Sequence, residues 1–300
     1  MEKHISPDRI ANSIMQSVDF KGHFVLVEGV KDLRLYSKFF DRERTRLIQT
    51  FGKYLQRQVF AILNQRGFNE KLGVRDADFL RIPGNGKYDP QYSDDVFVTD
   101  HHDSEVMIFN SDALYAFLDV VSAREKVDDF QRSRGCSIRD LVYNLCLPIA
   151  CLRYASKRYG LGLLFKPENP EGNRIKFKKF ICDRRLVFLG VDDLIRTVCD
   201  YSRARSPGMA SQVDILAAYN SVQGQGYSLL ELVNGHDVAE VLFMVLKKGL
   251  NSTSELLSGP DSVESALSLS FDFVEFSKTQ LYQSLLGWDG RVGADVLRRE

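Results

Sequence analysis

The sequence predicts an α/β protein, with a small parallel sheet in residues 1–125 and a mainly helical C-terminal region in residues 126–300. Two observations support this prediction. Short apolar runs without alternation recur through the first part and are typical of strands buried on both faces of a parallel sheet. Segments with apolar residues at helical spacing separate these runs, and after Ser111 the helical spacing dominates.

The individual elements follow from the same patterns. Strands are expected at residues 23–27, 45–49, 71–75 and 96–99. Helices are expected at residues 32–40, 53–66, 191–203, 209–221, 227–249 with a break near Gly235, and 261–287. Ser137-Ile138-Arg139-Asp140 resembles a capping box that begins a helix running toward Gly160, with a kink at Pro148. Residues 161–165 and 174–182 are expected to form a basic hairpin.

Composition limits the class of protein. The 300 residues are 44% hydrophobic and 27% charged, which is ordinary for a folded protein of one or two domains. The five cysteines are odd in number and form no C-x-x-C pair, so we expect reduced thiols in a cytoplasmic protein. The first residues contain no apolar leader, and the longest uncharged apolar run, residues 145–152, is too short to cross a membrane.

Charge is unevenly distributed although the net charge is zero. Residues 151–206 contain 13 basic and 6 acidic residues, a net charge of +7, and residues 207–300 contain 6 basic and 12 acidic residues, a net charge of −6. Aromatic residues alternate with the cations of the basic segment, which suits a nucleic-acid surface where cations contact phosphates and rings stack on bases. A solvated charged face explains the same pattern. Eleven of the 13 cations alternate with rings. They are Arg153, Lys157, Arg158, Arg174, Lys176, Lys178, Lys179, Arg184, Arg185, Arg203 and Arg205, and the rings are Tyr154, Tyr159, Phe177, Phe180 and Tyr201.

Carboxylates follow two of the expected strands. Glu28 comes directly after the apolar run 24–27, and Asp76 and Asp78 follow the strand at residues 71–75. Because ligands bind beyond the carboxyl ends of parallel strands, we expect these three side chains to converge on one pocket. Hard oxygen ligands of this kind select Mg²⁺ or Mn²⁺, and the chemistry implied is cleavage or transfer of a phosphodiester. The alternative is that these acids are ordinary turn and surface residues.

Four motifs in order give a family resemblance. They are Val27-Glu28-Gly29-x-x-Asp32, Gly52-Lys53, Asp76-x-Asp78-Phe79 and Val98-Thr99-Asp100-His101-His102-Asp103-Ser104-Glu105. This set resembles the Toprim-like family first catalogued as a domain of unknown function. Length, order and spacing are also similar to the Toprim effector subunits of the PARIS phage-defence systems. The resemblance covers about the first 110 residues well, and Gly235-His236-Asp237 is similar to a recurring element of the family's helical tail.

The resemblance implies roles for individual residues. Glu28 matches the acid that serves as general acid/base or metal ligand, Asp76 and Asp78 match the metal-binding pair, and Lys53 matches a basic position that neutralises a phosphate. The segment that contains His101 and Glu105 also follows a strand, so it is expected to add a ligand or a proton shuttle at the same edge.

Structural alternatives exist for the flanking polar residues. Asp103 or Ser104 would cap the following helix, with Glu105 in its first turn. Asp32 is expected to be the N-cap of the first helix after Glu28 rather than a ligand. His236 is expected to cap or pack within the helical region.

The resemblance further implies a function. It predicts a metal-dependent nuclease that cleaves RNA, specifically a tRNA loop. It also predicts an ATPase partner that holds the effector inactive until a phage protein triggers its release, and a homodimer once free. One alternative is a catalytically inert Toprim-like module whose acidic helical tail docks on an ATPase. Another is a DNA nuclease of the overcoming-lysogenization-defect type.

Overall fold

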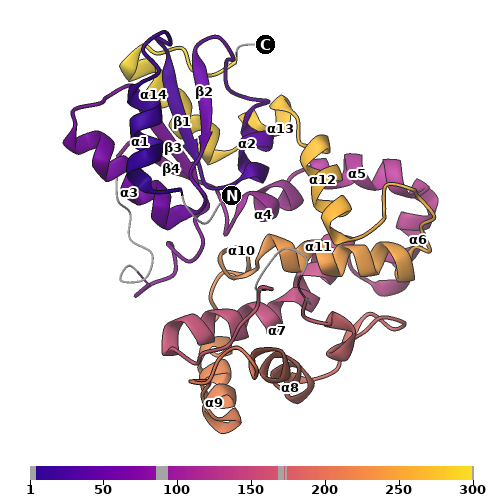
Figure 1. Ribbon diagram of the computed structural model, residues 1–300. Helices are drawn as coiled ribbons and strands as arrows, with labels where there is room; N and C mark the ends of the chain where they lie inside the picture. The colour runs from indigo at the N-terminus through magenta and orange to yellow at the C-terminus, as the bar shows by residue number, and fades with distance from the viewer. Residues whose placement is uncertain (1–4, 86–93, 168–171, 173, 299–300) are drawn as a thin grey trace. The chain divides into compact units, whose positions relative to one another are not determined.

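The computed structural model describes residues 5–85, 94–167, 172 and 174–298. The chain divides into two compact units. We call residues 1–80, 86–107 and 271–300 the sheet unit, and residues 81–85 and 108–270 the helical unit. A parallel four-stranded sheet with helices, followed by a mainly helical region, confirms the predicted fold class (Figure 1).

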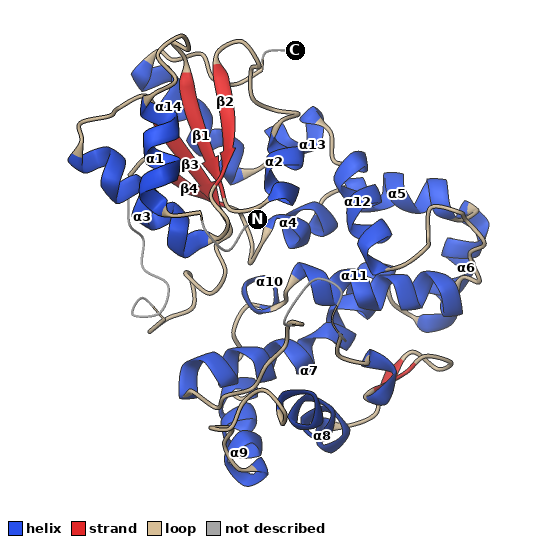
Figure 2. Cartoon of the chain, in the orientation of Figure 1, coloured by secondary structure: helices blue, strands red, loops and turns tan. Residues whose placement is uncertain are grey.

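The sheet consists of four parallel strands in the order β2-β1-β3-β4 (Figure 2). Their bounds are β1 His23–Val27, β2 Thr45–Gln49, β3 Lys71–Arg75 and β4 Val96–Val98, close to the predicted ranges. The chain leaves β1 for the edge strand β2 and then returns past β1 to β3. This reversal is a topological switch point, and in open parallel sheets ligands bind beyond the carboxyl ends of the strands at such a point. We call this edge of the sheet, beyond β1 and β3, the crevice.

Two helices cover one face of the sheet, α1 (Pro7–Met15) and α3 (Lys53–Gln65). Alternate residues of β1 point to opposite faces, and Phe24 and Leu26 point toward these helices. The buried cluster on this face contains Ile10, Ala11, Ile14, Phe24, Leu26, Val59, Phe60, Leu63 and Val96.

The opposite face is packed by α14 (Gln280–Val292), from the end of the chain. The Trp288 ring lies edge-on to His23 at 5.7 Å and to Phe97 at 6.2 Å, and its Nε1 donates to Asp95 at 3.1 Å. The neighbouring helix α13 (Phe273–Ser277) contributes Phe276, which packs edge-on to Tyr36 of α2 (Val30–Tyr36). The C-terminal segment from residue 271 onward therefore belongs to the sheet unit.

The helical unit is built around its longest helix, α7 (Ile138–Tyr159), against which α8, α9, α10 and α11 pack. Its N-cap is Ser137, whose hydroxyl accepts from Asp140 N at 3.0 Å, and this confirms the predicted capping site. The other helices are α4 Ser104–Asn110, which begins in the sheet unit, then α5 Ala113–Val121, α6 Arg124–Arg134, α8 Val191–Ser202, α9 Gln212–Gln223, α10 Leu229–Leu232, α11 Gly235–Met244 and α12 Pro260–Ser270.

Two sequence predictions in this part of the chain are wrong. No strand forms at residues 161–165, and the observed hairpin pairs β5 (Ile181–Cys182) with β6 (Val187–Phe188). The backbone of residues 161–165 bonds instead to a later segment, because Ala210 N donates to Leu161 O at 3.0 Å.

The helix predicted at residues 261–287 is three helices, α12, α13 and α14. The breaks are fixed by two side-chain caps. Asp272 accepts from Glu275 N at 2.9 Å, and Thr279 accepts from Tyr282 N at 3.0 Å.

No single helix among the described residues is long and apolar enough to span a membrane, although α6 and α7, bent by 56° at their junction, meet that test as a pair. All five cysteines are free thiols, and Cys146, Cys151 and Cys199 are buried.

Candidate functional site

The crevice beyond β1 and β3 brings together the three acids that the sequence singled out. Val27, the last residue of β1, is level with Val74 of β3, so Glu28 follows beside the end of β3. The Glu28 carboxylate accepts from the backbone N of Asp76 at 3.2 Å. Asp78 lies close enough to Glu28 to raise the pKa of that carboxyl. Residues about 50 positions apart in the sequence thus share one edge of the sheet.

Asp76 and Asp78 have different surroundings. The Asp76 side chain is half-buried, and its carboxylate accepts from Ser104 N, in the first turn of α4, at 3.0 Å. Asp78 has left-handed backbone, with φ of 49°, and its carboxylate lies 2.5 Å from the Nζ of Lys53. The imidazole Nε2 of His102 lies 4.0 Å from the other oxygen of Asp78. Lys53 and His102 therefore add positive charge or hydrogen-bonding capacity on the Asp78 side.

Three carboxyl groups of the crevice, those of Glu28, Asp32 and Asp76, hold their protons more tightly than ordinary ones. Burial, followed by the charges of Asp78 and Asp32, raises the pKa of Glu28 to about 7. Burial and the charge of Glu105 raise the pKa of Asp32 to about 6. Burial, then Asp32 and Glu28, raises the pKa of Asp76 well above its usual range. Like charges crowded in a poorly hydrated site have this effect, and a bound cation would reverse it.

Tyr36 of α2 contributes a buried hydroxyl near these acids. Its oxygen has no hydrogen-bond partner among the described residues, and the side chain is 1% exposed. It lies one helical turn after Asp32, on the same face of α2. Burial and the charges of Asp32 and Asp76 raise the pKa of the phenol well above its usual range, so Tyr36 stays protonated beside the carboxylates.

Hydrogen bonds from α3 and from two threonines hold the strand ends in place. Gln56 is fully buried, and its amide donates to the carbonyls of Leu26 at 2.9 Å and Val74 at 3.0 Å, near the ends of β1 and β3. The Thr50 hydroxyl donates to Val27 O at 2.8 Å. The Thr99 hydroxyl accepts from Ala77 N at 3.0 Å, between the two aspartates. These side-chain bonds tie α3 and the residues after β2 and β4 to the backbone at the strand ends.

The residues after β4 have two kinds of role. Some stabilise the start of a helix, and others contribute to the crevice. Asp103 caps α4, because its carboxylate accepts from Val106 N at 2.8 Å, and this confirms the capping alternative for that residue. Asp100 binds the first turn of α14 through Gln280 N and Leu281 N, both at 2.8 Å. Glu105 interacts electrostatically with Asp32 and accepts from the Ser104 hydroxyl at 3.1 Å.

The two histidines of this segment lie differently. His101 is partly exposed, and its backbone carbonyl accepts from the Thr99 hydroxyl at 2.8 Å. His102 is buried against the Phe79 ring at 4.7 Å. Its carbonyl accepts from Asp78 N, so His102 contacts the aspartate turn through both its backbone and its ring.

Asp32 caps α2 from inside the helix. Gly29 is the N-cap and Asp32 is the third helical residue, so the prediction that Asp32 is itself the N-cap is wrong. The Asp32 carboxylate accepts from Gly29 N at 2.8 Å in a capping box at the start of α2. The same carboxylate belongs electrostatically to the acid cluster, since its charge raises the pKa of both Glu28 and Asp76. Asp32 therefore contributes both to the start of α2 and to the acid cluster of the crevice.

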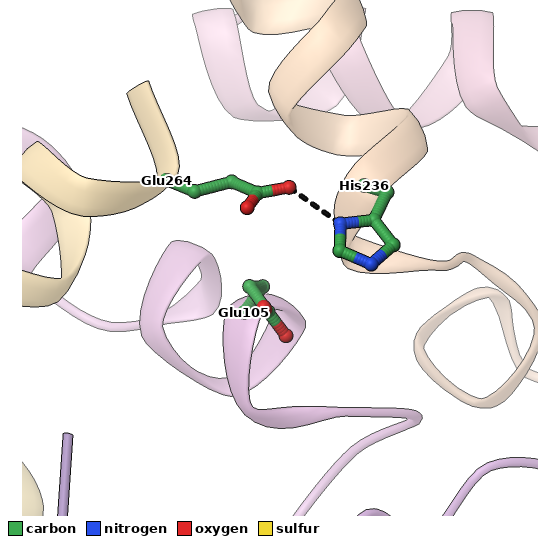
Figure 3. Close-up of side chains that lie close together, drawn as sticks. All are labelled: Glu105, His236 and Glu264. Atoms are coloured by element: carbon green, nitrogen blue, oxygen red, sulfur yellow. Dashed lines mark hydrogen bonds and ion pairs between the residues drawn. The ribbon is translucent and has the colours of Figure 1, made fainter. Parts of the chain in front are cut away.

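His236 and Asp237 lie in the helical unit, on α11. The Nδ1 of His236 is 2.5 Å from the Oε1 of Glu264 on α12, as Figure 3 shows, and the His236 side chain is about half exposed. Asp237 forms a buried two-point ion pair with Arg153 of α7, at 2.7 and 2.8 Å. This element of the sequence thus connects three helices of the helical unit.

The basic segment at residues 151–206 has less available surface than its composition indicated. Three of its five rings, Tyr154, Phe177 and Phe180, are buried, so they cannot stack on a base. Several cations are held by acids of the same unit, among them Arg153, Arg174 and Arg203. Lys176, Lys179, Arg184 and Arg185 are exposed around the hairpin β5–β6.

Comparison of the sequence with protein-family models and with curated proteins finds no match.

The donor set fits a hard divalent cation. Glu28, Asp76 and Asp78 offer carboxylate oxygens, the ligands that Mg²⁺ and Mn²⁺ prefer, and the raised pKa values of Glu28 and Asp76 mark carboxylates short of a counter-charge.

Tyr36, Gln56 and Thr50 were not predicted from the sequence. Nothing in their local pattern distinguishes them from ordinary helix and loop residues, because their roles depend on partners from other strands and helices.

Proposed function

We propose that the chain is a metal-dependent nuclease and that the carboxylate crevice is its active site. One observation carries the proposal: Glu28, Asp76 and Asp78 gather at the topological switch point of a parallel sheet, and the pKa values of Glu28 and Asp76 are raised there. Mg²⁺ or Mn²⁺ held by these carboxylates would polarise a phosphoryl oxygen and lower the pKa of a bound water.

The residues around the crevice have complementary roles in this proposal. Glu28 acts as general acid/base or as a ligand. Its pKa of about 7 is that of the cation-free site, and a cation bound beside it would lower that pKa. Asp76 and Asp78 hold the cation. Lys53, beside Asp78, neutralises a substrate phosphate. His101 and Glu105 are assigned as a proton shuttle or an additional ligand at the same edge.

The substrate and partners are proposed from the family resemblance. The four ordered motifs resemble the Toprim-like phage-defence effectors, and all four lie at the carboxyl edge of the described sheet, which supports this proposal. We therefore propose that the substrate is RNA, specifically tRNA, in the cytoplasm. We also propose that an ATPase partner restrains the chain until a phage protein releases it as a homodimer.

The test is cleavage by purified protein. Labelled tRNA and duplex DNA are incubated with the protein and Mg²⁺, and parallel samples contain EDTA. We expect tRNA cleavage with Mg²⁺ only, at least about a thousandfold slower in Glu28→Gln and Asp76→Asn. Glu43→Gln, the same change on an exposed glutamate of the sheet unit, serves as the control and should cleave like the wild type.

Other outcomes identify the alternatives. Cleavage of DNA but not of tRNA would favour the DNA nuclease. No cleavage of either, together with tight binding of an ATPase, would favour the inert docking module. Full activity of Glu28→Gln would reject the assignment of the crevice.

A further inference from the structure

A pocket lies on the face of the sheet covered by α1, next to the loop that leads from β2 into α3. It has a volume of about 470 Å³ and is walled by apolar side chains of α1, of β2 and of the loop after β2, among them Ile10, Ile48 and Phe51. Arg9 and Gln49 add a guanidinium and an amide to its lining. An apolar wall with an aromatic ring and a few polar groups is the usual composition of a site for a flat, polar ring.

The loop that carries Phe51 is bonded directly to the candidate active site. Gly52 N donates to the carbonyl of Glu28 at 2.9 Å, and the next residue, Lys53, contacts the Asp78 carboxylate. Phe51 is thus one residue from a backbone contact with Glu28 and two residues from the lysine of the crevice. A nucleotide strand with a phosphate at the crevice would bring an adjacent base to this wall.

The backbone at Phe51 is strained. Its φ is +61°, in the left-handed region, which is an uncommon conformation for a bulky residue. Gly52 follows with φ of +112°, so the loop already contains a residue suited to positive φ. A strained residue kept next to a candidate active site points to a use for its side chain.

We propose that this pocket binds the nucleobase next to the phosphate held at the crevice, with the base lying against the Phe51 ring. The chemical class of ligand is a nucleotide unit within an RNA strand. Arg9, exposed in the pocket lining, carries a positive charge suited to the neighbouring phosphate. The proposal rests on the proposed nuclease function for its ligand.

The experiment measures binding without cleavage. Adenosine 5′-monophosphate at millimolar concentration and a fluorescent single-stranded oligoribonucleotide are titrated into the protein in EDTA, with NMR and anisotropy as readouts. Phe51→Leu keeps an apolar side chain but removes the ring, and Phe51→Tyr keeps the ring. Tyr54→Ala removes a ring that is 67% exposed and outside the pocket lining, and it is the matched control.

We expect both ligands to bind at least about fivefold more weakly to Phe51→Leu, because loss of base stacking has this effect. Phe51→Tyr and Tyr54→Ala should bind within about twofold of the wild type. Unchanged binding by Phe51→Leu, or an equal loss in Phe51→Tyr or Tyr54→Ala, overturns the proposal. A loss for the mononucleotide alone also overturns it, because the ligand would then be a free nucleotide rather than an RNA strand.

Failure of the pocket assignment can be distinguished from failure of the nuclease proposal. If Phe51→Leu cleaves and binds RNA like the wild type, the pocket assignment fails while the nuclease stands. If the binding pattern is as expected but no cleavage occurs, the base pocket stands and the nuclease proposal fails.

Discussion

Buried acidic side chains have different neighbours in the two units of the chain. In the helical unit each buried or half-buried acid of α11 and α12 lies beside a basic side chain. Asp237 pairs with Arg153 at 2.7 Å, and Glu264 lies 2.5 Å from His236. Glu240 lies 3.9 Å from Arg174, whose charge opposes the effect of burial, which raises the Glu240 pKa to about 6. In the sheet unit the acids Glu28, Asp32 and Asp76 mainly face one another, and the pKa of each is raised.

This difference distinguishes charged groups that stabilise the fold from charged groups that are suited to binding a ligand. An ion pair satisfied within the protein tends to keep both groups ionised and fixes the packing of the helices that carry it. Crowded acids destabilise the fold when ionised, so their retention requires another benefit. Four predictions test this contrast, and each compares a residue of one unit with a matched residue elsewhere.

The largest expected effect is on stability in the helical unit. Asp237→Ala leaves the Arg153 guanidinium, whose side chain is 14% exposed, without its carboxylate, and we expect the free energy of unfolding to fall by about 3–5 kcal/mol. Urea denaturation in EDTA at pH 7.5 measures this change in the free energy of unfolding. Asp261→Ala, which removes an exposed partner of Arg174, should cost about 1 kcal/mol or less. Similar losses of unfolding free energy in the two variants would contradict the distinction between the buried Asp237–Arg153 pair and the exposed Asp261–Arg174 pair.

The second prediction concerns pH in the sheet unit. Glu28 has a pKa of about 7 in the folded chain against 4.5 ordinarily, so its stabilising contribution is complete below about pH 4.5 and is lost as pH rises through 7. The loss approaches about 3 kcal/mol, and Asp32 and Asp76 act in the same direction. We expect the melting temperature of metal-free protein to fall between pH 5 and 8. Mg²⁺ should restore it, and more strongly at pH 8 than at pH 5.5.

Two variants test which carboxyl groups cause the pH dependence and the effect of Mg²⁺. Glu28→Gln should flatten the pH dependence and weaken the effect of Mg²⁺. Glu240→Gln removes a carboxyl of the helical unit whose pKa is raised to about 6, chiefly by burial, so it should change the pH dependence but leave the Mg²⁺ effect intact. An Mg²⁺ effect absent at every pH would refute a cation site in the crevice.

The third prediction tests how the crevice is held open. Gln56→Leu leaves the carbonyls of Leu26 and Val74 without their buried donor, and we expect a loss of roughly 1–3 kcal/mol in the free energy of unfolding. The Mg²⁺-dependent rise in melting temperature should also shrink, because Glu28 and Asp76 follow these strands directly. Gln65→Leu, an exposed change on the same helix, should stay within about 0.5 kcal/mol of the wild type. Equal stability of the two variants would contradict the role of Gln56.

The fold of the sheet unit was largely predictable from local pattern. All four strands were found because a strand buried on both faces is a short apolar run, and this signal needs no knowledge of its neighbours. The meeting of Glu28 with Asp76 was also predictable, since parallel strands present their carboxyl ends at one edge.

The parts that could not be predicted depend on distant partners. Helical spacing indicates that α14 buries one face, but not that Trp288 packs beside β1 and β4. Composition indicates a basic aromatic segment, but the burial of Phe177 and Phe180 is decided by tertiary packing. In the same way, Gln56 and Tyr36 look like ordinary helix residues until the sheet places them at its edge.

The smallest expected effect on stability belongs to the basic surface near the hairpin β5–β6. Lys176, Lys179 and Arg184 are exposed, and replacing all three with Gln should change the free energy of unfolding by about 0.5 kcal/mol or less. If these side chains bind RNA phosphates, the triple variant should bind tRNA in EDTA more weakly. The slope of log K against log salt should fall by about 0.7–0.9 for each phosphate that the variant no longer neutralises.

The matched control replaces Arg132, Arg196 and Arg203, three exposed arginines that each pair with an aspartate three positions earlier. Because those charges are already neutralised locally, the control should keep the wild-type slope. Equal slopes for both triple variants would show that this surface, unlike the acidic crevice, carries charge without a ligand.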